Sequence, residues 1–353
     1  MKLVFVTQVY NPDHGVLGFV PRWVQGLAAN CEKVLVLALE AGENLELPAN
    51  VEVHSLGRKG RLNRYLKYYG HLRRAFGKDG YEALLAHMVP RYASLGDKFV
   101  RRSGGRTYLW YTHKGVDARL KRAVSLVDKV FTASDESLRI DTPKKVVTGH
   151  GIDAAHFAGR PSRRKPGDLR LLSVGRLTPA KDPITLIKIM AELHRRGVRA
   201  TLEWVGAGLV ATDEDYAREV LHQAEVHRVS RFIEWADTVP YPRIAPKYHQ
   251  ADLFLSSSLT GSVDKVVLEA MASGMPVLVS GEAYPPLWTE LGSDGDILHF
   301  QPGAAVEAAD KIIKLWNRSE DERNALGARL QAIAARDHQV DALMARLVQE
   351  MRG

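Results

Sequence analysis

The sequence predicts an α/β protein of two domains, each built around a parallel sheet. Short apolar, β-branched segments alternate with helical periodicity along all 353 residues. A chain of this length is longer than a single hydrophobic core usually supports. A polar stretch with two prolines interrupts the pattern of strands and helices at 159–168. We therefore predict a first domain at 1–158, a linker at 159–168 and a second domain at 169–336. A C-terminal helix at 337–353 could return to the first domain.

The first domain is predicted from short apolar segments separated by helical stretches. Its expected strands are Lys2–Thr7, Lys33–Leu39, Val51–Ser55, Ala83–His87, Thr107–Tyr111 and Lys129–Ala133. The helix Pro21–Ala29 begins with proline, whose missing N–H costs nothing at the first helical position.

The second domain repeats this design. Its expected strands are Leu169–Val174, Ala200–Val205, Ala251–Ser256, Pro276–Val279 and Asp296–Phe300. The segment Gln339–Met351 carries an apolar stripe at helical spacing and predicts one amphipathic helix. Ligands of open parallel sheets bind beyond the carboxyl ends of the strands, so the residues just after each strand are the candidates for a site.

The composition is that of a folded protein, with 45% hydrophobic and 25% charged residues. The single cysteine, Cys31, excludes an internal disulfide and a thiolate metal cluster, which favours a reducing compartment. The first apolar run, Leu3–Val6, is too short for a signal peptide or a membrane span, so we expect a cytoplasmic protein.

The net charge of +8 is concentrated in region 58–106. Thirteen basic residues stand there against Asp79, Glu82 and Asp97. Such a region suits a polyanion: nucleic acid, an anionic lipid surface or an acidic substrate.

Two cations, Arg176 and Lys181, follow the expected strand Leu169–Val174 and precede a helix that starts at Pro183. Arginine offers a planar fork of donors and lysine a compact charge, and a helix N-terminus favours anions. The pair could grip a diphosphate and neutralise charge on a departing nucleotide. The spacing of Arg176 and Lys181 alone would be explained better by two solvated cations in a loop.

Four segments follow one another over residues 146–279: VTGHGID with Phe157, then GRLTPAKD, EWVGAG and ADLFLSSSLTGSVDKVVLEAMASGMPV. In this order they resemble the retaining glycosyltransferases of family 4. The first half is similar more loosely, through LLAHM, YLWYTH and SLVDKVFTAS. The resemblance implies a GT-B fold, that is, two Rossmann-like domains facing each other across a cleft. The first domain would bind the acceptor and the second the nucleotide-sugar donor.

The resemblance also implies roles for residues near the end of the motif series. Glu269 would anchor the donor ribose, because a carboxylate accepts both protons of a diol. The family's preceding glutamate is absent, since Gly261 occupies its position. Asp264 could replace that carboxylate and Lys265 could reach a phosphate oxygen. Equally, Asp264 could cap the following helix while Lys265 is solvated.

Other candidates come from loops that the family places near its ligands. Gly15 and Gly206 would let the backbone approach the donor, although plain turns explain both. Asp13 and His14 could touch an acceptor. His113 matches a histidine near the transferred sugar in the family, whereas His87 is more simply a structural histidine.

Two Asp-x-Asp patterns could suggest a metal, but Asp213 with Asp215 opens a helix and Asp294 with Asp296 flanks a glycine turn. We interpret both as structural and expect no metal and no cofactor, with the nucleotide sugar as co-substrate. The donor base would be recognised around segment 234–239, where Trp235 departs from the family's glycine.

The expected function is a retaining, metal-independent glycosyltransferase of the hexosyltransferase type. It would move a sugar from a UDP- or GDP-sugar to a hydroxyl of a glycan or lipid-linked acceptor in cell-envelope or exopolysaccharide synthesis. Two alternatives share the fold: a catalytically idle glycan-binding or accessory protein, and a nucleotide-sugar epimerase. A nucleic-acid binder is disfavoured because no recognised module is present.

The helix predicted at Leu62–Phe76 has an apolar stripe with several arginines nearby. A core face is the usual explanation for such a stripe. The surrounding charge excess leaves open the hypothesis that region 58–106 contacts an anionic membrane surface, with the protein peripheral on the inner membrane face.

Overall fold

The structure is a computed structural model that describes residues 1–43, 45–159, 168–206 and 214–353. The chain divides into two compact units. Unit 1 comprises Met1–Gly151 together with Val340–Gly353, and unit 2 comprises Ile152–Gln339. The sequence predicted the boundary at 159–168, of which 160–167 lie outside the described residues.

The helix α5 (Ala154–Phe157) explains why unit 2 begins earlier than expected. The Phe157 ring is fully buried and packs against Tyr241 and Tyr248, with ring centroids 5.8 Å and 5.4 Å away. The Phe157 carbonyl oxygen also lies 2.9 Å from the Nε2 atom of His249. This segment therefore belongs to the core of unit 2.

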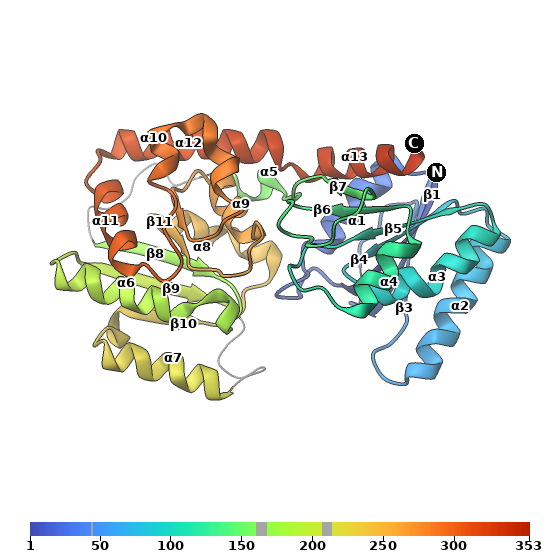
Figure 1. Ribbon diagram of the computed structural model, residues 1–353, viewed down its shortest axis with the longest axis horizontal. Helices are drawn as coiled ribbons and strands as arrows, with labels where there is room; N and C mark the ends of the chain where they lie inside the picture. Colours follow the sequence, from blue (N-terminus) through green and yellow to red (C-terminus); the bar gives the residue numbers. More distant parts are fainter. Residues whose placement is uncertain (44, 160–167, 207–213) are drawn as a thin grey trace. The chain divides into compact units, whose positions relative to one another are not determined.

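The described part of unit 1 contains seven parallel strands in the order β3-β2-β1-β4-β5-β6-β7 (Figure 1). The strands are β1 (Lys2–Tyr10), β2 (Lys33–Ala41), β3 (Val51–Ser55), β4 (Ala83–His87), β5 (Arg106–Trp110), β6 (Lys129–Thr132) and β7 (Lys145–Val147). The helices are α1 (Val20–Asn30), α2 (Arg61–Gly77), α3 (Pro90–Arg102), α4 (Ala118–Leu126) and α13 (Val340–Arg352).

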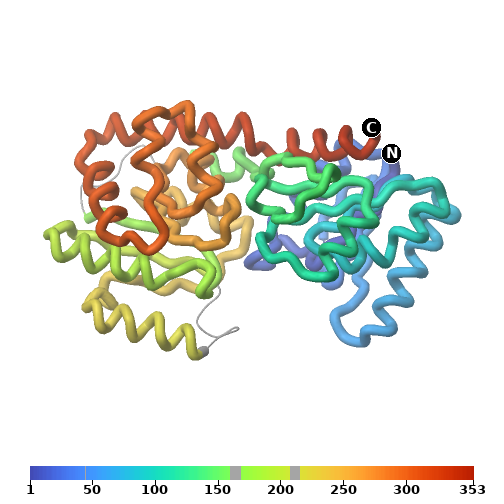
Figure 2. Tube along the Cα trace, viewed as in Figure 1, coloured from blue at the N-terminus to red at the C-terminus, as the bar shows by residue number. Residues whose placement is uncertain are grey.

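Two apolar layers cover the sheet of unit 1. One layer contains α1 and α13, with the buried side chains of Trp23, Leu343 and Leu347. The other contains α2, α3 and α4, with Leu72 and Leu120 among its buried side chains. The two ends of the chain therefore lie close together in unit 1 (Figure 2).

The described part of unit 2 contains five parallel strands in the order β10-β9-β8-β11-β12. Its strands are β8 (Leu169–Val174), β9 (Ala200–Val205), β10 (Ile233–Ala236), β11 (Leu253–Ser256) and β12 (Val277–Val279). Its longer helices are α6 (Pro183–Arg195), α7 (Glu214–Val226), α8 (Ala245–Gln250), α9 (Lys265–Ala272), α11 (Ala305–Trp316) and α12 (Glu320–Asp337). Shorter turns are η1 (Pro179–Lys181), η2 (Ser230–Phe232), η3 (Tyr241–Arg243), η4 (Pro285–Leu291) and α10 (Ser293–Asp296).

One predicted strand of unit 2, Asp296–Phe300, is wrong. Its first residue ends α10, and only an isolated bridge joins His299 to Val279. The side-chain ammonium of Lys311 donates to the carbonyls of Asp296 and His299, so a lysine takes acceptors that a strand would offer to a neighbour. In the described part of the chain, no helix combines the length and apolar character needed to cross a membrane.

Candidate functional site

The strand order of unit 2 places its switch point between β8 and β11. Connections leave the sheet in opposite directions there, and the carboxyl ends of the two strands open a crevice that open α/β sheets use for ligands. Gly175 and Arg176 follow β8, while Ser257 and Ser258 follow β11. The predicted diphosphate-binding segment is thus at the switch point.

Lys181 is held across this switch point. It ends the turn η1, and its stem lies over the end of β8, because a Cβ at Gly175 would be 3.7 Å from the lysine Cδ and Cε atoms. The Ser257 hydroxyl donates to the carbonyls of Lys181 and Asp182 at 3.0 Å and 2.7 Å, which joins η1 to the end of β11. Lys181 Nζ lies 3.4 Å from Ser258 Oγ.

Asp264 provides the counter-charge of Lys181. Its Oδ2 atom lies 2.7 Å from Lys181 Nζ, and the two side chains are only 13% and 19% exposed. Asp264 occupies the N-cap position of α9, yet its side chain makes no capping hydrogen bond. The capping alternative is therefore wrong, and the carboxylate faces the predicted diphosphate-binding lysine.

Two neighbours fix the position of Asp264. The Tyr284 hydroxyl accepts a hydrogen bond from the Asp264 backbone N–H at 2.9 Å. Gly261, three residues earlier, has a φ of 66°, in the left-handed region that side chains disfavour. The backbone at position 261 is therefore shaped for glycine, and the carboxylate next to Lys181 comes from position 264.

The helix α9 carries a buried polar group one turn further on. Glu269 is 6% exposed, and its Oε2 accepts a hydrogen bond from the Tyr248 hydroxyl at 2.7 Å. Burial raises the pKa of Glu269 to about 7, while the Tyr248 hydrogen bond and the nearby Lys265 favour the ionised form. Tyr248 is a partner that the sequence did not predict, because it comes from α8.

Lys265 lies one helical turn before Glu269, with its Nζ atom buried. Burial lowers the pKa of Lys265 well below its usual range, and the charge of Glu269 opposes this effect. The alternative of a solvated lysine is therefore wrong. Lys265 Nζ is instead buried, and it lies near enough to Glu269 for the charges of the two groups to influence each other.

Gly206 directly follows β9 and lies against Gly175, which directly follows β8. A Cβ there would lie 1.8 Å from the Gly175 carbonyl oxygen, which also accepts a hydrogen bond from Trp204 Nε1 at 2.9 Å. Only glycine fits this approach of two backbones. The rest of the predicted turn, Ala207 and Gly208, lies outside the described residues, as does Asp213.

Arg176 differs from Lys181 in its surroundings. Its side chain is exposed and forms no hydrogen bond or ion pair with any residue that the structure describes. The two predicted diphosphate ligands therefore comprise one paired lysine and one arginine open to solvent.

The other predicted residues belong to unit 1, in the loop between β1 and α1 and after β5. Asp13 and Gly15 are exposed, and Nδ1 of His14 accepts hydrogen bonds from the backbone N–H groups of Val16 and Leu17 at 3.1 Å and 3.0 Å. His113 is exposed, and its Nδ1 accepts from the N–H of Gly115 at 2.9 Å.

His87 is buried at the end of β4, with Nδ1 3.1 Å from the Thr7 hydroxyl. Its ring packs among those of Phe5, Phe19 and Trp23. These contacts make it part of the core of unit 1.

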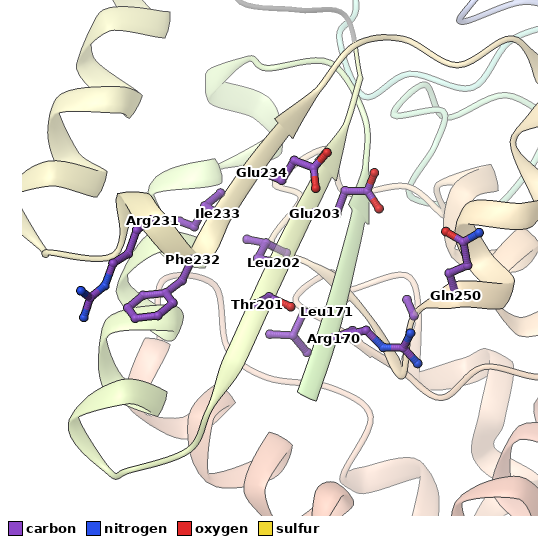
Figure 3. A pocket seen from close by; sticks show the side chains of 11 residues that line it. Arg170, Leu171, Thr201, Leu202, Glu203, Arg231, Phe232, Ile233, Glu234 and Gln250 are labelled. Carbon is purple, nitrogen blue, oxygen red and sulfur yellow. The ribbon is translucent and has the colours of Figure 1, made fainter. Parts of the chain in front are cut away.

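A separate pocket of about 410 Å³ lies on the strands β8, β9 and β10 of unit 2 (Figure 3). Arg170, Glu203 and Glu234 line it. Glu234 begins the segment 234–239 that was expected to recognise the donor base, whereas Arg176, Lys181 and Glu269 do not line this pocket. Arg170 pairs with Asp252 at 3.3 Å, and Glu203 pairs with Lys247. Two of the charged residues that line the pocket thus have ion-pair partners within unit 2.

The acidic residues offer no metal site among the described residues, where no cluster of three or more His, Cys, Asp or Glu side chains could hold an ion. Asp294 instead forms ion pairs with Arg318 and Arg329, each at 2.8 Å. Its partner in the Asp-x-Asp pattern, Asp296, ends α10.

Comparison with known proteins shows what the second unit is similar to. Residues 168–318 match the family model of the glycosyl transferases group 1. The glycogen synthase of Mycobacterium tuberculosis is 29% identical over 164 residues, which cover 46% of this chain and 38% of that protein. The D-inositol 3-phosphate glycosyltransferase of Kineococcus radiotolerans is 27% identical over 237 residues, covering 59% of this chain and 53% of that protein. The chain thus spans about half, or less, of the length of these curated relatives.

Solved structures resemble this chain over its whole length. The crystal structure of Anabaena HepE in complex with UDP is similar with a TM-score of 0.77 at 18% sequence identity, covering 100% of both chains. This likeness and the two parallel sheets confirm the predicted fold class, the GT-B type with two Rossmann-like domains.

Proposed function

We propose that this protein transfers a glycosyl group from a nucleotide diphosphate sugar to a hydroxyl, because residues 168–318 match the family model of the glycosyl transferases group 1. The observation that carries the proposal is the position of Lys181 at the switch point of unit 2, held over the end of β8 beside the start of α6. The donor diphosphate would bind there, between Lys181 and the solvent-open guanidinium of Arg176.

The donor nucleoside would lie further along the same edge of the sheet. Glu269 accepts the ribose hydroxyls, and the backbone at Gly206 and the segment 234–239 meet the base. UDP is the nucleotide in the HepE complex, and this supports a uridine donor over a guanosine donor.

The chemistry would proceed without a protein nucleophile and without a metal or other cofactor. Lys181 and Arg176 supply positive charge for the departing diphosphate. Asp264 is the carboxylate available in place of the family's first glutamate, and a donor phosphate oxygen accepts the proton of the acceptor hydroxyl. The configuration at the anomeric carbon is retained.

The acceptor would bind to unit 1. His113 follows β5, and Asp13 and His14 follow β1, so all three lie beyond carboxyl ends of strands of that sheet. We propose a glycan or lipid-linked acceptor in cell-envelope or exopolysaccharide synthesis, with the protein in the cytoplasm or peripheral on the inner membrane face.

The diphosphate site is tested by replacing its two cations together. We expect Arg176→Ala with Lys181→Ala to weaken binding of UDP and of UDP-sugars at least tenfold in calorimetric titration, because each charge-assisted bond contributes about 1.5–3 kcal/mol. The matched control is Lys188→Ala with Lys314→Ala, which removes two exposed lysines elsewhere in unit 2. Equal UDP affinity in the double variant and the parent would reject this site.

A catalytically idle, nucleotide-binding protein is the second candidate. The left-handed backbone at Gly261 favours it, because this position is built for glycine and not for the family's glutamate. A panel of nucleotide sugars with sugar and lipid-linked acceptors separates the two. Nucleotide binding with neither transfer nor donor hydrolysis would identify the idle protein, and interconversion of the nucleotide sugar without acceptor would identify an epimerase.

A further inference from the structure

The two most exposed large apolar side chains in the described part of the chain lie on one helix. Leu62 is 73% exposed and Leu66 is 63% exposed, and both are on α2, four residues apart. Residues at this spacing lie side by side on a helix surface. They therefore form a single apolar ridge and not two scattered leucines.

The opposite face of α2 is buried. Tyr68, Leu72 and Phe76 pack into the apolar layer of unit 1. The Tyr68 hydroxyl donates to the carbonyl of Tyr92 at 2.7 Å, which ties α2 to α3. The ridge thus projects from a helix that is firmly held, and in Figures 1 and 2 this helix lies at the edge of unit 1.

Cations surround the ridge. Lys59, Arg61, Lys67 and Arg73 are exposed, and none of them forms an ion pair within the described residues. Other cations of region 58–106 are neutralised: Arg58 pairs with Glu40, Arg74 with Asp79, and Arg101 with Asp97. Lys78, Lys98, Arg102 and Arg106 of the same region are also exposed without an ion pair among the described residues, so the cations beside the leucines belong to a broader basic region.

We infer that the exposed surface of α2 and of the segment just before it, defined by Lys59, Arg61, Leu62, Leu66, Lys67 and Arg73, docks on an anionic lipid bilayer. An apolar ridge with a cationic border matches the boundary between acyl chains and acidic headgroups. The leucines enter the acyl boundary, and the long lysine and arginine stems reach back to the headgroups. Charge complementarity selects the anionic bilayer as the occupant. The inference does not depend on the donor site in unit 2.

The test is co-sedimentation of the full chain with vesicles of phosphatidylcholine containing 30% phosphatidylglycerol. We expect binding that weakens as salt rises and that is absent with pure phosphatidylcholine. Leu62→Ser with Leu66→Ser, and separately Lys59→Gln with Arg61→Gln and Lys67→Gln, should each reduce the partition coefficient at least tenfold. The matched control is Val226→Ser with Val306→Ser, which removes two apolar side chains, each 57% exposed, from unit 2.

A fluorescent probe tests insertion directly. Burial raises the pKa of the Cys31 thiol to about 11, so an environment-sensitive dye should label Leu62→Cys selectively. Its emission should shift to shorter wavelength with anionic vesicles, whereas a dye at Val306→Cys should not respond.

Four outcomes would overturn the inference. They are no co-sedimentation at low salt, equal loss of binding in the Val226 and Val306 control, an unchanged spectrum at position 62 in bound protein, and binding to nucleic acid alone. A concentration-dependent dimer that the leucine substitutions abolish, without vesicle binding, would show that α2 docks on a second copy instead.

Discussion

At the scale of single residues, the pair formed by Lys181 and Asp264 links the nucleotide site to its chemistry. The carboxylate lies 2.7 Å from the ammonium that we propose binds the diphosphate. An incoming diphosphate therefore competes with Asp264 for the same cation. Low exposure makes this pair stronger than an ordinary surface ion pair, because water screens it less.

Replacing Asp264 should separate binding from catalysis. In Asp264→Asn the competing charge is gone, so we expect UDP to bind about threefold to tenfold more tightly, which corresponds to ~1 kcal/mol. The transfer rate kcat should fall at least tenfold if the carboxylate attends the reacting sugar. Titration calorimetry and initial rates measure the two effects. Weaker UDP binding would instead mean that Asp264 mainly orients Lys181.

The pKa of Glu269 predicts how nucleotide binding depends on pH. Burial raises this pKa from its ordinary value of 4.5 to about 7. The folded state thus holds the proton more tightly than the unfolded state, and this carboxyl costs stability as pH rises from 4.5 through 7. Ribose binding needs the ionised form, so UDP affinity should increase between about pH 6 and pH 8.

Two substitutions at neighbours of Glu269, and one at Glu269 itself, test this assignment. Lys265→Met removes the cation that favours ionised Glu269, and Tyr248→Phe removes a hydrogen bond to the same carboxylate, so each should move the increase in UDP affinity to higher pH. Glu269→Gln should abolish the increase. Calorimetric titration at several pH values is the measurement. An unchanged profile in both variants would mean that another group titrates.

At the scale of elements, most strands were predictable because their apolar runs are continuous. The strands β1, β4 and β8 are nearly all buried, and such segments stand out in a sequence. The strands β7 and β10 were missed, since they have only three and four residues and Ile233 is the one buried residue among them. The partners of the site could not be predicted, because Tyr248 and Tyr284 reach it from α8 and the start of η4.

The close contact between Gly206, just after β9, and the Gly175 carbonyl predicts the effect of adding a side chain at position 206. Gly206→Ala would place a methyl group 1.8 Å from the Gly175 carbonyl, so β8 and β9 must move apart. We expect a loss of roughly 1–3 kcal/mol in the stability of unit 2 and weaker UDP binding. Gly70→Ala in α2 is the control, because its Cβ would meet nothing within 4 Å. In calorimetric unfolding, Gly206→Ala should lower the transition temperature of unit 2 and leave that of unit 1 unchanged.

At the scale of the whole chain, the sequence predicted two α/β domains and left open where the last helix packs. Its apolar stripe is visible in the sequence, but a stripe does not reveal which surface it covers. The structure shows α13 beside α1 in unit 1, where the Tyr108 hydroxyl donates to the Met351 carbonyl at 2.7 Å and Arg22 pairs with Asp341 at 2.6 Å. Unit 1 is therefore completed only by the last residues of the chain.

This connectivity predicts which unit each core helix stabilises. Leu347 in α13 is fully buried in unit 1, and Leu330 in α12 is fully buried in unit 2. Each leucine-to-alanine change should cost about 2–5 kcal/mol in its own unit. Hydrogen exchange measured by mass spectrometry should then rise in peptides of β1 and α1 for Leu347→Ala, and in peptides of β8 and α9 for Leu330→Ala. If either substitution accelerates exchange equally in both sets of peptides, the units do not unfold separately, and α13 is then part of one cooperative core.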